Sequence, residues 1–130
     1  MLVQELMTPN PITIVPEASL EEALGLMTRN DIHELPVVSG TRLEGIITAR
    51  DLRGALGNND PETSELAREV HEVMSETVEV VMAETPMSEA CRRLASLRIS
   101  SVPVVGPELE LIGILSITDI LGAAADRFDD

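Results

Sequence analysis

Short apolar stretches and amphipathic stretches follow one another along the chain in a regular order. Residues 12–15 (Ile-Thr-Ile-Val) are mostly β-branched and follow turn residues, which predicts a short strand. Residues 19–22 (Ser-Leu-Glu-Glu) form a capping-box sequence, which predicts the start of a helix. The apolar residues of that helix recur at the spacing of one helical face: Leu20, Ala23, Leu24 and Met27. A strand followed by an amphipathic helix is therefore expected.

Two more strands and a second helix are predicted to complete the first half of the chain. Residues 35–38 (Leu-Pro-Val-Val) are short and wholly apolar, as is typical of a buried strand. Residues 43–48 predict the next strand, in which Gly45 would allow another backbone segment to approach closely. A helix is expected to begin near Asp51. The predicted order is β-α-β-β-α.

The same pattern returns about 67 residues further along the chain. The helical spacing is repeated by Met87, Ala90, Cys91 and Leu94. The other expected elements are strands at 78–82, 102–105 and 109–116, and a helix that begins near Asp119. A further helix is expected to be capped by Thr85, with Pro86 at its first position. Residues 58–63 are polar turn residues and predict a linker, with a connecting helix over 64–71. A pattern repeated at a fixed period predicts an α+β fold made of two β-α-β-β-α repeats.

Length and composition are those of a globular domain. The chain has 130 residues, 44% of them hydrophobic, which is enough to bury one core. No apolar stretch reaches the roughly 18 residues that a membrane span needs, and the first residues lack the basic region of a signal peptide. We therefore expect a cytoplasmic protein that does not bind membranes.

The charge is strongly negative. The formal net charge is −14, and all nine basic residues are Arg. Acidic chains without Lys are typical of halophilic organisms, although GC-rich coding also depletes Lys. Such a chain is a poor ligand for nucleic acid, because binding phosphates depends on Lys and Arg. Nucleic acid is therefore not an expected partner.

Catalytic chemistry is sparse in this sequence. Two His, the single Cys91 and scattered carboxylates show no spacing typical of metal ligands, and there is no glycine-rich phosphate loop. Cys91 lies on a predicted helix face, where a Cys usually packs as a small apolar side chain. We expect neither an enzyme activity nor a cofactor.

The repeated motifs identify a family resemblance. Each half contains a Pro-Val-Val stretch, Leu-Pro-Val-Val at 35–38 and Val-Pro-Val-Val at 102–105. Each stretch is followed by the pattern Gly-Ile-x-Thr/Ser-x-x-Asp, which ends at Asp51 in the first half and at Asp119 in the second. Met-Thr at 7–8 and Met-Ser at 74–75 precede them in register. The chain thus resembles a stand-alone pair of CBS (cystathionine β-synthase) domains. The expected divisions are motif 1 at 1–56, a linker with a short helix at 57–69, motif 2 at 70–125, and an acidic tail at 126–130.

The resemblance implies both an architecture and a class of ligand. In the family, the two repeats pack around a pseudo-twofold axis, and the pairs commonly form homodimers. Members typically bind adenosine-containing compounds (AMP, ADP, ATP or S-adenosylmethionine) and regulate a partner protein. The expected function is therefore a regulatory adenosyl-ligand-binding module, and the alternative is a ligand-free interaction or dimerisation module.

The repeated Thr/Ser-x-x-Asp motif supports either function. A hydroxyl residue followed three positions later by an acidic one caps a helix, which would explain Thr48 with Asp51 and Ser116 with Asp119. The same helix N-terminus can also receive a phosphate, and a carboxylate can accept hydrogen bonds from both ribose hydroxyls. In the family the Asp holds ribose, so the resemblance adds ligand binding to capping.

The resemblance also implies two clefts, each built from both halves of the chain. One cleft would combine Thr13, Ile32, His33 and Leu35 with Ser116, Thr118 and Asp119. The other would combine Val80, Ile99, Ser100 and Val102 with Thr48, Arg50 and Asp51. The apolar Ile32 and Ile99 would enclose the base.

The two expected clefts differ in charge. The second has Arg50 beside Asp51, and an Arg recognises phosphate well through its planar guanidinium; the alternative role of Arg50 is a solvated or ion-paired surface residue. The first has Ile-His-Glu-Leu-Pro at 32–36, which resembles the Ile-His-Arg-Leu-Pro stretch of the γ subunit of AMP-activated protein kinase. Glu34 replaces the phosphate-binding Arg of that stretch, which favours a neutral or cationic ligand there. His33 is either a phosphate ligand or a partly buried polar residue.

Overall fold

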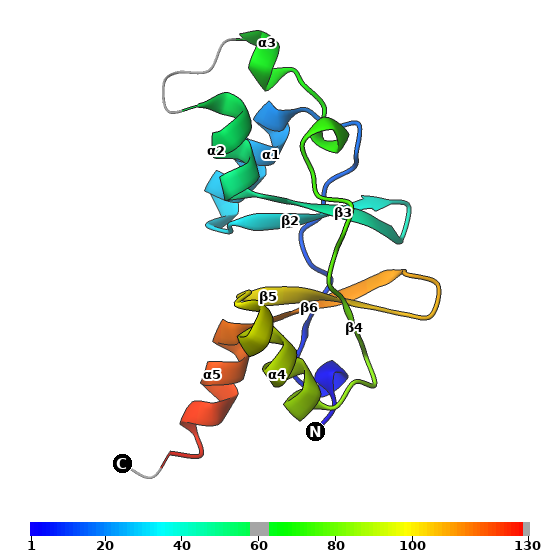
Figure 1. Cartoon of the computed structure of the whole chain (residues 1–130), viewed down its shortest axis with the longest axis vertical. Coiled ribbons are helices and arrows are strands. Elements are labelled where there is room, and N and C mark those ends of the chain that lie inside the picture. Colours follow the sequence, from blue (N-terminus) through cyan, green and yellow to red (C-terminus); the bar gives the residue numbers. More distant parts are fainter. Residues whose placement is uncertain (58–62, 129–130) are drawn as a thin grey trace. The chain divides into compact units, whose positions relative to one another are not determined.

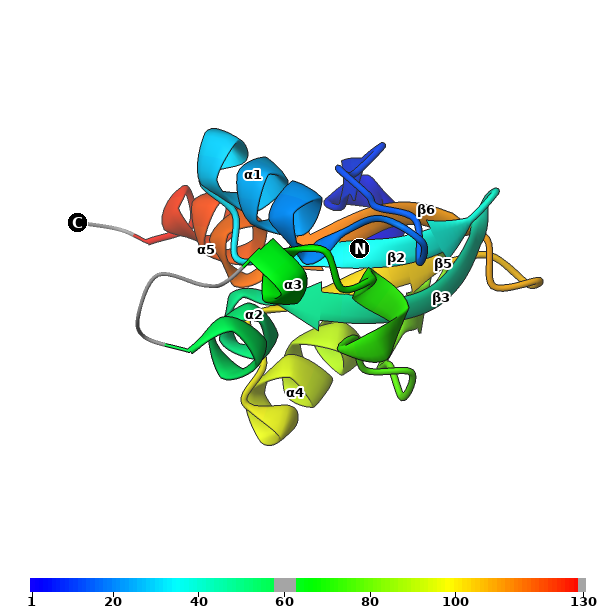
Figure 2. The ribbon, with the colours of Figure 1, turned by 90° about the horizontal axis from the view of Figure 1, so that it is seen from above.

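The computed structural model describes residues 1–57 and 63–128. Helices and strands are interspersed along the chain, as Figures 1 and 2 show. In order, the elements are η1 (Val3–Glu5), β1 (Thr8–Pro9), α1 (Leu20–Asn30), β2 (Glu34–Ser39), β3 (Arg42–Thr48), α2 (Ala49–Leu56), α3 (Thr63–Leu66), η2 (Val70–Glu72), β4 (Val81–Met82), α4 (Met87–Leu97), β5 (Ser101–Val105), β6 (Leu111–Ser116) and α5 (Ile117–Ala125). The predicted α+β class is confirmed.

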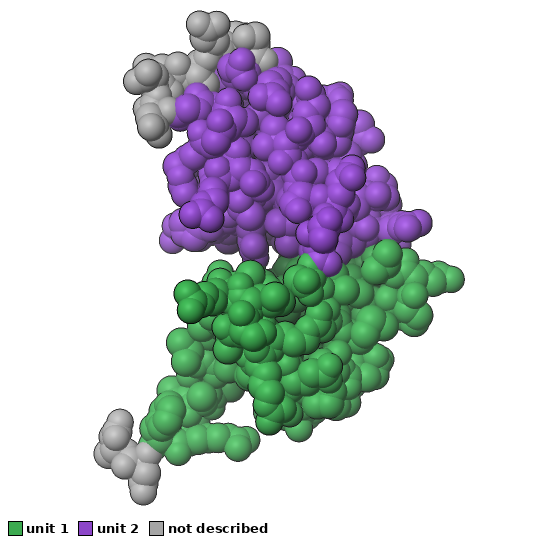
Figure 3. Space-filling view, viewed as in Figure 1, with its two compact units in different colours: residues 1–11, 79–130 green, residues 12–78 purple. Residues whose placement is uncertain are grey.

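The chain forms two compact units, which Figure 3 distinguishes by colour. Unit 1 contains residues 1–11 and 79–130, and unit 2 contains residues 12–78. The boundaries do not follow the repeats, because the first eleven residues pack with the second half of the chain. Each unit is described by itself below.

Unit 2 is a β-hairpin with two helices on one face (Figure 1). Strands β2 and β3 pair antiparallel, with Leu35 opposite Ile47 and Glu34 opposite Thr48. Alternate residues of β2 and β3 point toward α1 and α2, where they form an apolar core. Its fully buried members include Leu20, Ala23, Leu35, Val37 and Ile47.

Unit 1 repeats this arrangement, with α4 and α5 against β5 and β6. Its sheet has the strand order β1-β6-β5-β4, in which β4 runs parallel to β5 and the other pairs are antiparallel. The core is again apolar, and Val81, Val104 and Leu115 are among its most buried residues. The helix–strand–strand–helix order therefore occurs in both units, as the repeat predicted.

The segment that leads into each repeat packs on the other repeat. Thr8 precedes the first repeat but pairs with Ile114 of β6 in unit 1. Ser75 precedes the second repeat but pairs with Ile46 of β3 in unit 2, through two backbone hydrogen bonds of 2.9 and 3.0 Å. Gly45 and Gly113 lie where these segments cross the strands. The close approach expected at Gly45 is confirmed, since a Cβ there would lie 2.6 Å from the Ser75 carbonyl oxygen.

Several predicted elements differ from the structure. The strand expected at 12–15 is reduced to one parallel bridge between Ile14 and Val37. The strand expected at 109–116 begins at Leu111, because Leu109 has a left-handed backbone (φ 64°) that interrupts an extended strand. The helix expected over 64–71 is two short turns, α3 and η2. Residues 58–62 of the expected linker lie outside the described residues.

Two predicted helix details also need correction. Thr85 does not cap α4: Pro86 is the N-cap residue, and the Thr85 hydroxyl accepts a hydrogen bond from the Met82 N–H at 3.0 Å instead. Leu24 lies on the predicted apolar face of α1 but is 41% exposed, because the groove between α1 and α2 leaves it uncovered. Ser19 does cap α1, by accepting the Glu22 N–H at 3.1 Å.

Candidate functional site

The N-terminus of α2 presents a hydroxyl and a carboxylate in a complete capping box. The Thr48 hydroxyl accepts a hydrogen bond from the Asp51 N–H at 3.1 Å, and the Asp51 Oδ2 accepts one from the Thr48 N–H at 2.9 Å. A carboxylate has about four acceptor positions on its two oxygens. Capping therefore leaves acceptor positions of Asp51 available, including those on Oδ1. We call Thr48, Arg50 and Asp51 the Asp51 site.

The N-terminus of α5 in unit 1 has the same geometry. The Ser116 hydroxyl accepts from the Asp119 N–H at 3.1 Å, and the Asp119 Oδ2 accepts from the Ser116 N–H at 3.2 Å. Both capping boxes expected from the sequence are thus confirmed. We call Ser116, Thr118 and Asp119 the Asp119 site.

Each of these helix N-termini is held against the residue that precedes the first strand of its hairpin. The Ala49 N–H donates to the His33 carbonyl oxygen at 2.7 Å, and the Ile117 N–H donates to the Ser100 carbonyl oxygen at 2.8 Å. Within unit 2 the structure thus brings His33 beside the Asp51 site. Within unit 1 it brings Ser100 beside the Asp119 site. The grouping of residues from different halves into two clefts stays a prediction.

The Asp51 site has donors suited to an anion. Arg50 is exposed, and its side chain forms no ion pair within residues 1–57 and 63–128. The amide N–H groups of its neighbours Ala49 and Asp51 donate to His33 and to Thr48, whereas that of Arg50 lies in the first turn of α2, where N–H groups have no partner within the helix. Such an N–H and a guanidinium at a helix N-terminus favour a phosphate group. The corresponding position in the Asp119 site is Thr118, which is exposed and uncharged.

The remaining candidate residues divide by burial. The side chains of Leu35 and Val102 are only 0% and 3% exposed in the cores of their units, so only their backbone could contact a ligand. Ile32 and Ile99 are partly buried and pack against those same cores. Thr13 and Val80 are half-buried beside the residues that bridge to β2 and β5, and His33 and Ser100 are exposed.

Glu34 is a half-buried acidic residue beside the Asp51 site, directly opposite Thr48 in the hairpin. Burial raises the pKa of the Glu34 carboxyl above its ordinary value of 4.5, because the charged form loses hydration. At pH values between 4.5 and the raised pKa, Glu34 is therefore protonated more often in the folded protein than in the unfolded chain. As the pH rises through this range, Glu34 loses its proton in the folded protein and lowers the free energy of unfolding.

Replacing Glu34 by Gln is expected to stabilise the protein at pH 7 and to have a smaller effect at pH 5. The reason is that Gln has no charge to desolvate, whereas the advantage disappears when Glu34 is itself protonated. Urea unfolding at both pH values measures the difference. Glu44→Gln, at an exposed position of β3, controls for the loss of one negative charge. Equal effects of Glu34→Gln at both pH values would show that burial of the charge is not the cause.

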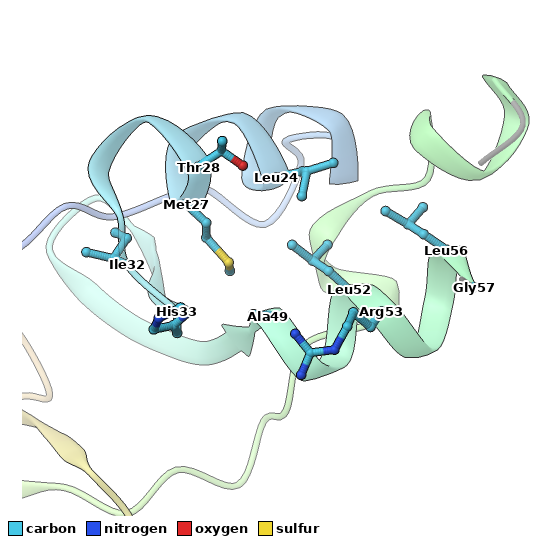
Figure 4. Close-up of a pocket in the computed structure, with 10 residues that line it drawn as sticks. All are labelled: Leu24, Met27, Thr28, Ile32, His33, Ala49, Leu52, Arg53, Leu56 and Gly57. Atoms are coloured by element: carbon cyan, nitrogen blue, oxygen red, sulfur yellow. The ribbon is translucent and has the colours of Figure 1, made fainter. Parts of the chain in front are cut away.

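Unit 2 also contains a pocket that the sequence did not indicate. It has a volume of about 330 Å³ and lies between α1 and α2 (Figure 4). It is lined by Leu24, Met27, Thr28, Ile32, His33, Ala49, Leu52, Arg53, Leu56 and Gly57. Ile32 and His33 lie at one end, while the residues of the Asp51 site do not line it. The sequence carried no signal for this pocket, because the helical spacing placed Leu24 on the buried face, whereas Leu24 is 41% exposed in the structure.

A contact to Asp119 was likewise missed. The Thr8 hydroxyl donates to the Asp119 carboxylate, at 3.3 Å from Oδ2 and 3.4 Å from Oδ1. Thr8 is 111 positions away in the chain and reaches Asp119 because β1 pairs with β6. The repeated Met-Thr and Met-Ser dipeptides drew attention to Thr8 and Ser75, but the sequence did not predict which residues they contact.

The described part of the chain contains neither a metal-ligand cluster nor a membrane-spanning helix. Within the described ranges, no three His, Cys, Asp or Glu residues come together as metal ligands. Across the same ranges, no helix is both long and apolar enough to cross a bilayer.

These observations define a class of protein: a tandem α+β repeat in which a hydroxyl and a carboxylate cap the last helix of each repeat. The sequence model of the CBS domain matches residues 3–58 and 70–126. The chain therefore belongs to the CBS domain family, as the repeated motifs indicated.

Two relatives show how such a pair occurs in other proteins. A CBS domain-containing protein of Dictyostelium discoideum is 33% identical over 129 residues, which cover 93% of this chain and 89% of that protein. An inosine-5′-monophosphate dehydrogenase of Korarchaeum cryptofilum is 37% identical over 109 residues, covering 84% of this chain. The matched part is only 21% of that dehydrogenase.

Two similar solved structures contain adenosine compounds. CBSX2, whose structure was solved in complex with AMP, has 28% sequence identity to this chain and a TM-score of 0.85. The match covers 97% of each of the two chains. The CBS domain pair of protein MJ0100, in complex with 5′-methylthioadenosine and S-adenosyl-L-methionine, is 27% identical, with a TM-score of 0.83 and 98% coverage of both chains.

Proposed function

We propose that this chain is a regulatory module that binds an adenosine-containing compound and signals its occupancy to a partner protein. The observation that carries the proposal is the Asp51 carboxylate, which caps α2 through Oδ2, while no side chain bonds to its Oδ1 among the described residues. The complexes of CBSX2 with AMP and of the MJ0100 pair with S-adenosylmethionine support the class of ligand.

The chemistry of the Asp51 site suits the ribose and phosphate of such a compound. Neighbouring 2′- and 3′-hydroxyls can both donate to one carboxylate, and hydrogen bonds to a charged acceptor are the stronger ones. The guanidinium and the N–H of Arg50, in the first turn of α2, can then receive a phosphate. Because the chain carries a net charge of −14, this local positive charge must offset a repulsive field.

The proposed signal is a difference in affinity between two arrangements of the protein. A ligand shifts such an equilibrium only as far as it binds one arrangement more tightly. We propose that the protein acts as a homodimer and that the C-terminal helix transmits the signal. In support, Leu121 of α5 is 60% exposed and could contact a partner.

Titration calorimetry with AMP, ADP, ATP, S-adenosylmethionine and 5′-methylthioadenosine tests the proposal, with GMP as the control for the base. The titrations are made in molar KCl and in low salt, because salt screens the negative field to about 3 Å at 1 M. Micromolar binding of at least one adenosine compound, with no binding of GMP, is the expected result. No binding of any compound in either salt would contradict the proposal and favour a ligand-free interaction module, in which the Asp residues only cap helices.

A further inference from the structure

The Asp51 and Asp119 sites share their capping geometry but differ in one side-chain contact. The Thr8 hydroxyl donates to both oxygens of Asp119, at 3.3 and 3.4 Å. The residue that corresponds to Thr8 beside the Asp51 site is Ser75. Its hydroxyl donates instead to the Thr77 carbonyl oxygen, at 3.2 Å. Among the described residues, no side chain outside the capping box bonds to Asp51.

The backbone around Thr8 holds its hydroxyl in place. Thr8 and Pro9 form β1, which pairs with Ile114 and Gly113 in the middle of β6, the strand that leads into α5. A β-branched Thr has restricted χ1 rotamers, and a residue that precedes Pro is restricted to extended backbone. Ser75 has neither restriction, because it is unbranched and is followed by Glu76. The difference between the two sites therefore follows from the residue types at matched positions.

Thr8 takes up part of the acceptor capacity of Asp119 that two ribose hydroxyls would need. The Asp119 Oδ2 already accepts the Ser116 N–H, and Thr8 adds a donor shared by both oxygens. Of the roughly four acceptor positions of the carboxylate, only one, on Oδ1, then has no donor. A ribose diol could therefore donate both of its hydrogen bonds to Asp119 only by displacing the Thr8 hydroxyl, so part of the binding free energy would be lost. Losing one hydrogen bond to a charged acceptor weakens binding by about tenfold or more.

We infer that Thr8 closes the Asp119 site to ribose, so that each chain binds one adenosyl ligand, at the Asp51 site. The inference rests on the proposed function, because it concerns which of the two carboxylates receives the ligand. It adds Thr8 as the residue that determines occupancy. It also explains how one module can hold two repeated motifs and use one.

Calorimetric stoichiometry with AMP and with S-adenosylmethionine tests this inference on the full chain. The wild-type protein is expected to bind one molecule per chain. Thr8→Val keeps the size and β-branching of the side chain but removes the donor, so it is expected to gain a second binding event. Thr8→Ser keeps the hydroxyl and should retain a stoichiometry of one. Ser75→Ala is the matched control, and it should leave stoichiometry and affinity unchanged because Ser75 does not bond to Asp51.

The outcomes separate the inference from the proposed function. Two molecules per wild-type chain, or a single one for Thr8→Val, would overturn the inference and leave the proposed function standing. Weaker binding by Thr8→Val would also overturn it, since Thr8 would then assist the ligand. No binding of either compound by any of the four proteins would overturn the proposed function, and the inference with it. Circular dichroism of each variant shows that it is folded.

Discussion

Replacing Gly45 by Ala is expected to reduce the free energy of unfolding by about 3 kcal/mol, the upper part of the range for overpacking a buried position. An added Cβ would lie 2.6 Å from the Ser75 carbonyl oxygen and 2.9 Å from the Met74 sulfur. The sulfur can move, because Met is flexible. The carbonyl oxygen cannot move easily, because it accepts the Ile46 N–H at 3.0 Å. The substitution therefore separates residues 74–75 from β3.

Urea unfolding of the wild type, Gly45→Ala and Gly54→Ala measures this effect. Gly54 is the matched control: it lies inside α2, and a Cβ there would meet nothing within 4 Å. Ala at this helical position should stabilise the protein by about 0.5–1 kcal/mol. If Gly45→Ala did not lower the free energy of unfolding, residues 74–75 would not pack on β3 as described.

Replacing Asp51 by Asn is expected to weaken binding of an adenosyl ligand by about thirtyfold or more, because two ribose hydroxyls lose a charged acceptor. The effect on folding should be smaller. An Asn oxygen can still accept the Thr48 N–H, so the main loss is a negative charge at the N-terminus of α2, about 0.3–1 kcal/mol. A large effect on affinity with a small effect on stability would separate ligand binding from capping.

Asp119→Asn is the matched control for Asp51→Asn. Asp119 caps α5 with the same hydrogen bonds, so its replacement should cost similar stability. Calorimetry and urea unfolding of both variants compare the two quantities directly. Equal losses of affinity in the two variants would indicate that both carboxylates bind ligand. If neither variant lost affinity, both motifs would serve only as helix caps.

The hairpins and main helices were predictable because their signals are local. The apolar stretch 35–38 is buried where it was expected, and the hydroxyl and carboxylate of each Thr/Ser-x-x-Asp motif form the predicted cap. A cap is made by residues three positions apart, and a buried strand is apparent in its own composition. These features need no knowledge of the rest of the chain.

The features that were missed depend on contacts between distant parts of the chain. Thr8 and Asp119 are 111 positions apart, and only the pairing of β1 with β6 brings them together. The strand expected at 12–15 has the right composition but makes only one bridge, because strand formation needs a partner with matching register. The pocket in unit 2 depends on how far α1 and α2 lie apart, which side-chain periodicity does not determine.

Comparing a ribose ligand with its 2′-deoxy form in two proteins tests most directly whether Asp51 holds the ribose. The tightest adenosyl compound of the calorimetric panel and its 2′-deoxy analogue are each titrated into the wild type and Asp51→Asn in molar KCl. The wild type is expected to bind the ribose form at least about tenfold more tightly, because the 2′-deoxy form lacks one hydrogen bond to a charged acceptor. Asp51→Asn should bind the two forms nearly equally. If the wild type does not distinguish them, or Asp51→Asn distinguishes them as well as the wild type does, Asp51 does not hold the ribose.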